Sequence, residues 1–419
     1  MTDWKLLDRE NRGLLIAAKS HIKRRGDLYL VPSQSGQGKY EVLIDTDKPR
    51  CDCQDFLNRG VECKHIYAVR FYVQRQQNDD GSETVTETVQ VTQTVKRTYR
   101  QNWPAYNAAQ TSEKRHFQTL LHDLCAKVEN PSQRTGRPRL PLPDALFSAI
   151  FKVYSTVSGR RFMSDLAEAK ERGHVNRLPH YNSVFNVMED PAVTPILRQM
   201  VELSGLPLKS VECDFAADSS GFSCSRFVRW FDHKYGGERK AHAWVKCHIM
   251  CGVKTNVVTA VEIQEPYAND AAQMPALIET TARNFKMAEV SGDGAYLTHQ
   301  NMAAIERHGA VPFITFRPSS VSTEKHPPIW RKMFHLFQYN RDEYMAHYHK
   351  RSNVETTFSM VKAKFRDHLR SKTDVAMVNE CLCKFICHNV CCVISAIHEL
   401  NIEMPFWAES QVAQKVADF

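Results

Sequence analysis

The chain has 419 residues, which is too long for one ordinary hydrophobic core and predicts two or three domains. Its formal net charge of +8 favours a polyanionic partner but excludes the extreme basic excess of ribosomal or histone-like proteins, so such a partner is expected to meet local patches. No uninterrupted apolar run reaches the ~18 residues of a membrane span, and no membrane partner is expected.

Thirteen cysteines are spread along the chain, and no secretory segment is recognisable. Unpaired cysteines in this number are typical of a reducing compartment, because disulfides form and persist in oxidising ones. We therefore expect a soluble, cytoplasmic protein.

One short segment holds a group of candidate metal ligands in the order Cys-x-Cys-x9-Cys-x-His: Cys51, Cys53, Cys63 and His65. Three thiolates and an imidazole suit a closed tetrahedral zinc site, although unliganded buried cysteines would give the same pattern. The segment resembles the SWIM-type zinc finger, including a strand expected over residues 39–46 and an apolar helix after the last ligand. The resemblance implies one structural Zn²⁺ in a module over residues 1–76 that recognises DNA or a protein.

Residues 77–102 are polar, rich in Thr, Gln and Val, and show no helical periodicity. Their alternation of Thr or Glu with Val would also suit an edge strand. Low complexity and an Asp-Asp-Gly-Ser opening favour an extended, flexible linker instead.

Residues 103–206 are predicted to form an all-α domain. Ser112 is expected to cap its first long helix, and a proline-rich break separates this helix from the second. Gly136-Arg137-Pro138 resembles the core of a minor-groove hook, and a proline-stiffened link between helices explains the same residues. The basic residues that are candidates for DNA contacts are Arg134, Arg137, Arg139, Arg160, Arg161, Lys170 and Arg172.

Residues 207–375 are rich in strands, and their order predicts three antiparallel strands followed by alternating strands and helices. The expected strands are 210–217, 226–232, 242–253, 256–263, 287–292 and 310–316. Only about 30 residues separate the last strand from the next polar helix, too few for an inserted domain. That connection carries Trp330, Phe334 and Phe337, for which core packing is favoured over stacking on a flipped base.

Two aspartates are expected at the ends of these strands. Asp218 is followed by Ser-Ser-Gly, which predicts a turn, and Asp293 stands between two glycines after an apolar run. Asp214 is an alternative to Asp218, because a period of two places both on one face of the strand. Asp270 precedes an apolar helical stretch and is more simply explained as an N-cap or first-turn acid.

Four polar residues share one stripe of a predicted helix: Tyr348, Arg351, Glu355 and Lys362. Their separations of three, four and seven residues place them within an arc of about 60°. A solvated charged face would give the same pattern. Apolar residues from Val354 to Leu369 form a neighbouring stripe, so Glu355 is expected at the edge of a core.

The spacing Tyr-x2-Arg-x3-Glu-x6-Lys resembles the helix that carries the last catalytic acid of DDE transposases of bacterial insertion sequences. The surroundings of Asp218 and Asp293 resemble the two upstream motifs of that family. The resemblance implies a mixed α/β, multidomain protein, in which an all-α domain and a small zinc finger precede a ribonuclease-H-like catalytic domain. It also implies a homodimer that cleaves DNA at terminal inverted repeats and joins the 3′-ends to target DNA.

Three converging carboxylates repel one another and stay ionised near neutral pH only when a cation neutralises them. Oxygen ligands favour Mg²⁺ or Mn²⁺, and this chemistry uses two ions about 3.5 to 4 Å apart. The resemblance implies that Asp218 bridges both ions, while Asp293 and Glu355 each hold one. It further implies DNA contacts by the rest of the stripe: Arg351 and Lys362 to the backbone, and Tyr348 to a terminal phosphate.

Residues 376–419 are predicted to be a C-terminal helical segment. Cys383, Cys387 and Cys391 recur every four residues beside His388, which would suit a second metal site, but the apolar residues around them favour a buried helix. Two other functions stay open: a non-catalytic DNA-binding protein derived from a transposase, and a structure-specific nuclease that does not join strands.

Overall fold

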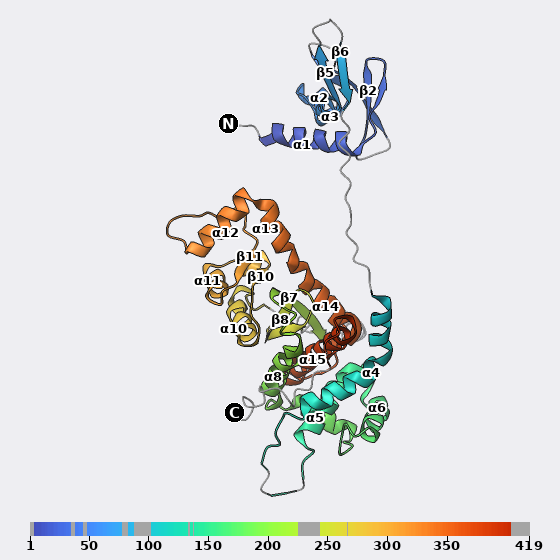
Figure 1. Cartoon of the computed structure of the whole chain (residues 1–419), viewed down its shortest axis with the longest axis vertical. Coiled ribbons are helices and arrows are strands. Elements are labelled where there is room, and N and C mark those ends of the chain that lie inside the picture. Colours follow the sequence, from blue (N-terminus) through green and yellow to red (C-terminus); the bar gives the residue numbers. More distant parts are fainter. Residues whose placement is uncertain are drawn as a thin grey trace, which may run out of the picture. The chain divides into compact units, whose positions relative to one another are not determined.

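The computed structural model describes residues 4–34, 38–44, 48–77, 83–87, 102–132, 135–136, 138–224, 244–265 and 267–403. Within these ranges the protein is mixed α/β, as predicted, and it divides into two compact units, Met1–Arg100 and Gln101–Phe419 (Figure 1). The strand expected at 226–232, the candidate DNA contacts Arg134 and Arg137, and most of the predicted linker lie outside the described residues.

The first unit contains a small antiparallel sheet with helices against it. Its elements are α1 (Trp4–Lys19), β1 (Lys23–Arg25), β2 (Leu28–Pro32), β3 (Lys39–Leu43), β4 (Arg50–Cys51), α2 (Gln54–Arg59), α3 (Lys64–Tyr72), β5 (Val73–Gln77) and β6 (Glu83–Glu87). Strands β1 to β4 pair in chain order. Helix α1 packs closely on α3 at Gly13, where an added Cβ would lie 2.9 Å from the Lys64 carbonyl oxygen.

Strands β5 and β6 form an antiparallel hairpin that starts within the module predicted to end at residue 76. Residues 83–87 therefore adopt the strand that was the alternative to a flexible linker. The Val and Thr alternation in this segment suits a pleated strand, in which successive side chains point to opposite faces.

The second unit opens with α4 (Trp103–Cys125), α5 (Leu142–Ser155), α6 (Gly159–Glu171), α7 (Tyr181–Glu189) and α8 (Val193–Gly205). Helix α4 begins nine residues before the expected cap at Ser112, so that prediction was wrong. Asn102 caps the helix instead, because its side-chain oxygen accepts a hydrogen bond from the Ala105 amide at 3.3 Å. The Ser112 hydroxyl donates to the Ala108 carbonyl within the helix.

The rest of the second unit is a sheet with helices on both faces. Its strands are β7 (Asp214–Cys224), β8 (Trp244–Gly252), β9 (Val258–Gln264), β10 (Glu289–Gly292), β11 (Val311–Ile314) and β12 (His368–Leu369). Its helices are α10 (Met274–Asn284), α11 (His299–Arg307), α12 (Pro328–Tyr339), α13 (Arg341–Tyr348), α14 (Ser352–Phe365) and α15 (Asp374–Glu399), with single 3₁₀ turns η1 (Leu206–Leu208), η2 (Ala271–Gln273), η3 (Gly294–Tyr296) and η4 (His349–Arg351).

The strand order is β11-β10-β7-β8-β9, with β12 beside β7. Strands β7, β8 and β9 are antiparallel neighbours, whereas β10 runs parallel to β7 and β11 parallel to β10. This arrangement matches the predicted meander of three antiparallel strands followed by alternating strands and helices.

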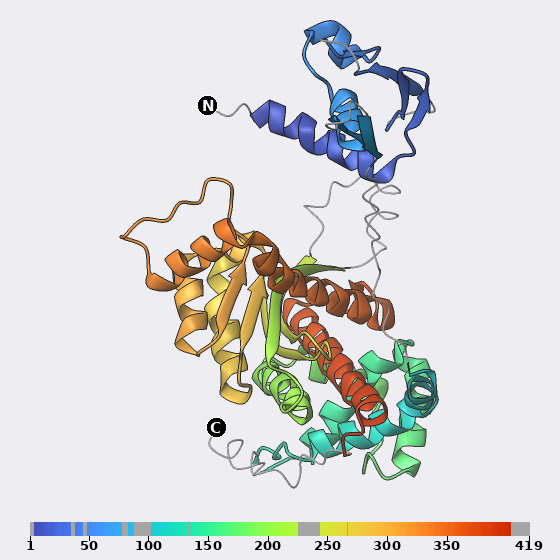
Figure 2. The same ribbon diagram turned by 45° about the horizontal axis from the view of Figure 1, so that its top comes forward.

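The alternation of side chains along β7 assigns the two faces of the sheet. Phe215 and Ala217 belong to the core under α10, α11 and α12, while Ala216 and Phe222 belong to the core under α14 and α15. Figure 2 shows helices on both sides of the strands. Asp218 has the same parity as Ala216 and therefore faces α14.

Helix α15 joins the helical segment and the sheet into one core. It contacts α4, α5, α7 and α8 as well as β8 and β9, and one continuous apolar cluster runs through all of them. The predicted borders at 206/207 and 375/376 consequently do not separate independent cores. Among the described helices, α15 alone is long and apolar enough to cross a membrane, but 78% of its most apolar window is buried in the protein. A helix that is apolar all round needs such a surround.

A buried amide fixes α15 against its neighbours. The Asn389 Oδ1 atom accepts a hydrogen bond from the Val258 amide at 2.8 Å. Its Nδ2 atom donates to the carbonyl oxygens of Val201 and Val258 and to the Ser204 hydroxyl. The side chain is fully buried, and it is a partner of the Val258 amide in a region shielded from solvent. The Ser204 hydroxyl and the Val201 carbonyl also bond to each other.

We expect Asn389→Ala to lower the free energy of unfolding by about 2 to 3 kcal/mol, because it removes the hydrogen bonds between α15 and buried groups on α8 and β9. Urea unfolding followed by circular dichroism measures this loss. The control Asn186→Ala, at an exposed position of α7, should stay within about 0.5 kcal/mol of the parent protein. Equal stability of both variants would contradict the role of Asn389.

Candidate active site and metal centre

Asp218 and Asp293 lie side by side on the neighbouring parallel strands β7 and β10, Asp218 within β7 and Asp293 just after β10. Ala217 of β7 lies opposite Gly292 of β10, and the next residues are Asp218 and Asp293. Parallel strands are about 4.8 Å apart, so the register alone brings these two residues side by side. Strand β10 ends there, and Asp293 begins η3.

The turn predicted after Asp218 is absent. Strand β7 continues to Cys224, and Ser219 to Gly221 pair with β8. Main-chain pairing with the long strand β8 outweighs the local turn preference of Ser-Ser-Gly. Gly221 instead makes room for Trp244, since an added Cβ would lie 2.5 Å from the nearest atom of the indole ring.

Arg351 connects the first and last of the predicted acids. One guanidinium nitrogen donates to Asp218 Oδ2 at 2.9 Å, and the other donates to Glu355 Oε1 at 2.6 Å. All three side chains are at least partly shielded, although Glu355 is the most exposed at 57%. The structure thus brings Glu355 beside Asp218, in the middle of β7, with a guanidinium between the two carboxylates.

The polar stripe does not lie on a single α-helix as predicted. Tyr348 ends α13, Arg351 ends the 3₁₀ turn η4, and Glu355 lies in the first turn of α14. Two residues of this tighter turn bind side chains of β7: Lys350 binds Asp214, and Arg351 binds Asp218. The interruption keeps the stripe residues near one another but changes their angles around the axis.

Burial raises the pKa of Asp218 above its usual value, and the negative charges of Asp293 and Glu355 raise it further. A hydrogen bond from the Ser219 amide and the charge of Arg351 act in the opposite direction. Three carboxylates and one guanidinium leave a formal charge of −2, which a divalent cation would offset. Among the described residues, the finger is the one cluster of three or more candidate metal ligands, so the three acids do not converge to that degree in this arrangement.

Two further stripe residues flank the acids. The Lys362 ammonium donates to Ser220 Oγ at 2.6 Å and lies over the Phe222 ring, and burial lowers its pKa. Ser220 shares the face of Asp218, so this positive charge stands one step along β7 from the first acid. Tyr348 packs against the apolar cluster of β10 and β11.

Asp214, the alternative first acid, is occupied elsewhere. Its carboxylate pairs with Lys350 at 2.7 Å, and Lys350 also binds Glu289. Asp214 does share a face with Asp218, as expected, but lies four residues earlier, about 13 Å along the strand. The structure therefore favours Asp218 as the partner of Asp293 and Glu355.

The sequence interpretation missed a polar group behind the acids. Asp270 is the N-cap residue of η2, as expected, but its side chain makes no capping hydrogen bond. Its carboxylate accepts from Ser219 Oγ at 3.3 Å and pairs with Lys246 and His248. Buried His248, whose pKa burial lowers to about 4, also lies 3.3 Å from the Tyr296 hydroxyl. The available signal was Lys246 and His248 at alternate positions of an apolar strand.

The aromatic residues before the polar stripe pack in the core, as favoured. Trp330 and Phe337 are buried, and both rings contact Phe316 at the end of β11 together with Phe334. They are not available for stacking on a base in this arrangement.

The finger ligands converge from three elements. Cys51 ends β4, Cys53 precedes α2, Cys63 precedes α3, and His65 lies in the first turn of α3. All four are buried, and their ligand atoms lie within 4.8 Å of one another. The His65 Nδ1 atom lies 3.8 Å from both the Cys51 and Cys63 sulfurs.

The three thiols of the finger affect one another's ionisation. A hydrogen bond from Cys51 lowers the pKa of Cys63 to about 4, whereas the same bond raises the pKa of Cys51. Burial raises the pKa of Cys53. Three thiolates could coexist here only around a cation, and this donor set suits tetrahedral zinc.

The cysteines of α15 line a core helix, as favoured over a second metal site. Cys383 and Cys387 are buried, and the described residues contain no metal-ligand cluster around them. His388 directs its Nε2 atom to the Asn256 carbonyl at 2.9 Å.

Comparison with known proteins confirms both resemblances drawn from the sequence. Residues 209–390 match the family model of the transposase DDE domain, and residues 40–73 match that of the SWIM zinc finger. Neither curated proteins nor solved structures gave a match. The first match contains all three predicted acids, and the second contains all four predicted zinc ligands. The chain carries a transposase DDE domain preceded by an N-terminal SWIM zinc finger.

Proposed function

We propose that the protein is an active DNA transposase that cuts at the terminal inverted repeats of its element and joins the 3′-ends to target DNA. The observation that supports this most directly is the common level of Asp218 and Asp293 on β7 and β10, with Glu355 linked to Asp218 through Arg351. Three acids from distant parts of the chain thereby lie near the middle of β7, where the neighbouring strand β10 ends.

Asp218, Asp293 and Glu355 would hold Mg²⁺ or Mn²⁺, because their oxygens are hard ligands and the cluster carries net negative charge. A pair of such ions, when bound, activates the attacking water or 3′-hydroxyl and stabilises the leaving oxygen. Asp218 would take part in holding these ions together with the other two acids, because the charges of both Asp293 and Glu355 act on its carboxylate.

Arg351 and Lys362 carry the positive charge around the acids. In the absence of cations, Arg351 offsets the repulsion between Asp218 and Glu355. Its remaining N–H groups, together with Lys362, are suited to the phosphate oxygens of a DNA strand. We propose that Tyr348 contacts a terminal phosphate, as the family resemblance implies.

Two transposon ends must be processed together, and we propose that a homodimer does so. Exposed basic residues on α6 and before α5 would contribute to binding of the terminal repeats: Arg139, Arg160, Arg161 and Lys170. The finger, with one structural Zn²⁺, would add a second contact to DNA or to a protein.

We expect Glu355→Gln to abolish Mg²⁺-dependent cleavage of terminal-repeat DNA and to leave DNA binding intact, since the change removes a charge but keeps the shape. Gel analysis of cleaved strands and a binding assay measure the two effects. Glu306→Gln, at an exposed position of α11, is the matched control and should cleave normally. Cleavage by the Glu355 variant at the parent rate would remove Glu355 from the mechanism.

Joining of pre-cut ends to a target plasmid distinguishes a transposase from a nuclease. Joined products that need Glu355 support the transposase, whereas cleavage without joining supports a structure-specific nuclease.

We expect Arg351→Met to lower the melting temperature in the absence of divalent ions, because two carboxylates lose their shared counter-charge. Mg²⁺ should raise the melting temperature of this variant more than that of the parent protein. Differential scanning fluorimetry measures both shifts, with Arg331→Met on the exposed face of α12 as the control. An Mg²⁺ shift no larger than that of the parent protein would argue against ion binding by these acids.

We expect the purified chain to contain one zinc ion, and Cys63→Ser to lose it, because one sulfur ligand of a closed site is removed. Mass spectrometry of the metal content tests this, with the exposed Cys213→Ser as the control. Full zinc retention by Cys63→Ser would exclude the proposed ligand set.

A further inference from the structure

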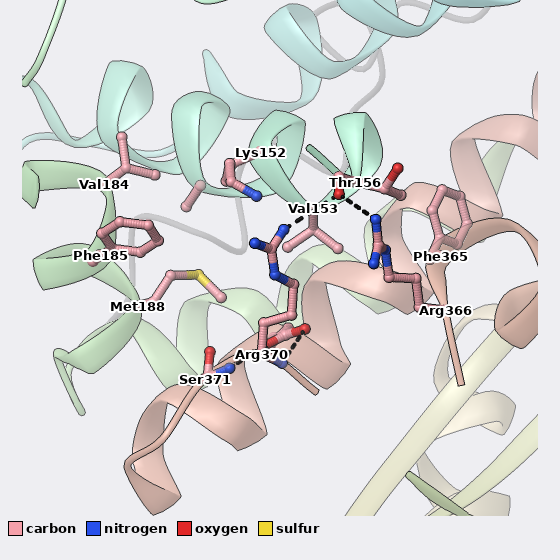
Figure 3. Close-up of a pocket in the computed structure, with 12 residues that line it drawn as sticks. Lys152, Val153, Thr156, Val184, Phe185, Met188, Phe365, Arg366, Arg370 and Ser371 are labelled. Carbon is pink, nitrogen blue, oxygen red and sulfur yellow. Dashed lines mark hydrogen bonds between the residues drawn. The ribbon is translucent and has the colours of Figure 1, made fainter. Parts of the chain in front are cut away.

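A second basic site lies in a pocket of about 180 Å³ beyond the end of α14. Helices α5 and α7 form one side of it, and the segment from Phe365 to Ser371 forms the other. Figure 3 shows Lys152, Arg366 and Arg370 directed into the same space, with Phe185 and Met188 on the wall. None of these residues belongs to the acid cluster or to the finger.

Among the described residues, none of the three cations of this pocket forms an ion pair with an acid, although the Glu380 carboxylate lines the pocket and its charge acts on Lys152. Glu380 is the only acid that lines the pocket, and its oxygens accept hydrogen bonds from the backbone amides of Arg370 and Ser371. The two arginines donate to main-chain oxygens instead: Arg366 to Thr156, and Arg370 to Thr156 and Val157. These carbonyls are neutral acceptors, so Glu380 is the one negative charge that the pocket lining sets against three positive charges.

Lys152 is the least satisfied of the three cations. Its ammonium makes no hydrogen bond or ion pair with the described residues, although the side chain is only partly exposed. Burial lowers its pKa to about 8, and the charge of Arg370 acts in the same direction. The charge of Glu380 raises this pKa in part, and that of Arg366 lowers it. An anion in the pocket would favour the charged form of this lysine.

The backbone around the pocket is strained where it holds the arginines. Arg366 has a φ of 76° and Thr156 a φ of 56°, in the left-handed region that disfavours residues with a Cβ. The buried ammonium of Lys384 donates to the Arg366 carbonyl at 3.0 Å and so holds this conformation. The protein therefore maintains a costly geometry that keeps three cations together.

We propose that this pocket binds one phosphate group of the DNA backbone through Lys152, Arg366 and Arg370. The inference rests on the proposed function, because DNA is the source of the phosphate. The volume is below the roughly 300 Å³ of pockets for larger ligands and suits one small anionic group. The apolar wall at Phe185 and Met188 suits the adjoining sugar.

The position of the pocket is compatible with one continuous DNA segment. Ten residues separate Glu355 at the start of α14 from Phe365 at its end, which corresponds to about 15 Å. Phosphates of one strand recur every 3.4 Å or so along a duplex, so the bound phosphate would lie roughly four nucleotides from the cut.

The test is the salt dependence of DNA binding by Lys152→Met. Loss of one phosphate contact should reduce the slope of log K against log salt by about 0.9. The control Lys332→Met removes one exposed lysine of α12 and should leave the slope unchanged. Lys152→Met should melt at or above the temperature of the parent protein, because the lysine is partly desolvated without a partner.

Equal slopes for Lys152→Met and the parent protein, or equal losses in both variants, would overturn the pocket proposal. Failure of the parent protein to bind terminal-repeat DNA would overturn the proposed function instead. A last experiment adds inorganic phosphate and measures the melting temperature of the parent protein and of Lys152→Met. If phosphate raises it only in the parent protein, while the two proteins show the same salt dependence of DNA binding, the pocket binds a free anion and the DNA contact is refuted.

Discussion

The parallel pairing of β7 with β10 is the constraint on which the candidate active site depends. Its register sets Ala217 opposite Gly292 and thereby makes Asp218 and Asp293 neighbours. A slip of one residue would turn Asp218 to the opposite face of the sheet. Packing on both faces prevents such a slip, because Ala216 and Ala217 belong to different apolar cores.

Electrostatics then couple the sheet to the helix that carries the last acid. The negative charges of Asp293 and Glu355 raise the pKa of Asp218, and Arg351 offsets part of that effect while it joins Asp218 to Glu355. Lys350 forms a second ion pair with β7, at Asp214. Both ion pairs are formed by residues of η4, so the 3₁₀ turn between α13 and α14 places these two positive charges beside the acids of β7.

Helix α15 gives the site a rigid support. Its buried Asn389 and its apolar surface join the helical segment to the sheet, so α14 is packed against a single large core. The same helix supplies Lys384, which holds Arg366 at the far end of α14. Helix α14 thus carries Glu355 beside Arg351 in its first turn and ends next to Arg366 of the basic pocket. The finger, by contrast, has a small core of its own to which Cys51, Cys53 and Cys63 belong.

The sequence by itself determined the features that depend on local spacing. The Cys and His pattern gave the finger ligands, alternation and order gave the sheet, and the spacing of Arg351 and Glu355 gave a pair that meets across one helical turn. Tertiary structure decided what depends on distant partners. Long-range pairing with β8 abolished the turn expected after Asp218, and the surrounding helices turned a predicted terminal segment into the central α15. Lys152 and Arg370 are more than 200 residues apart in sequence, so only the packing of α5 against the end of α14 could bring their charges together.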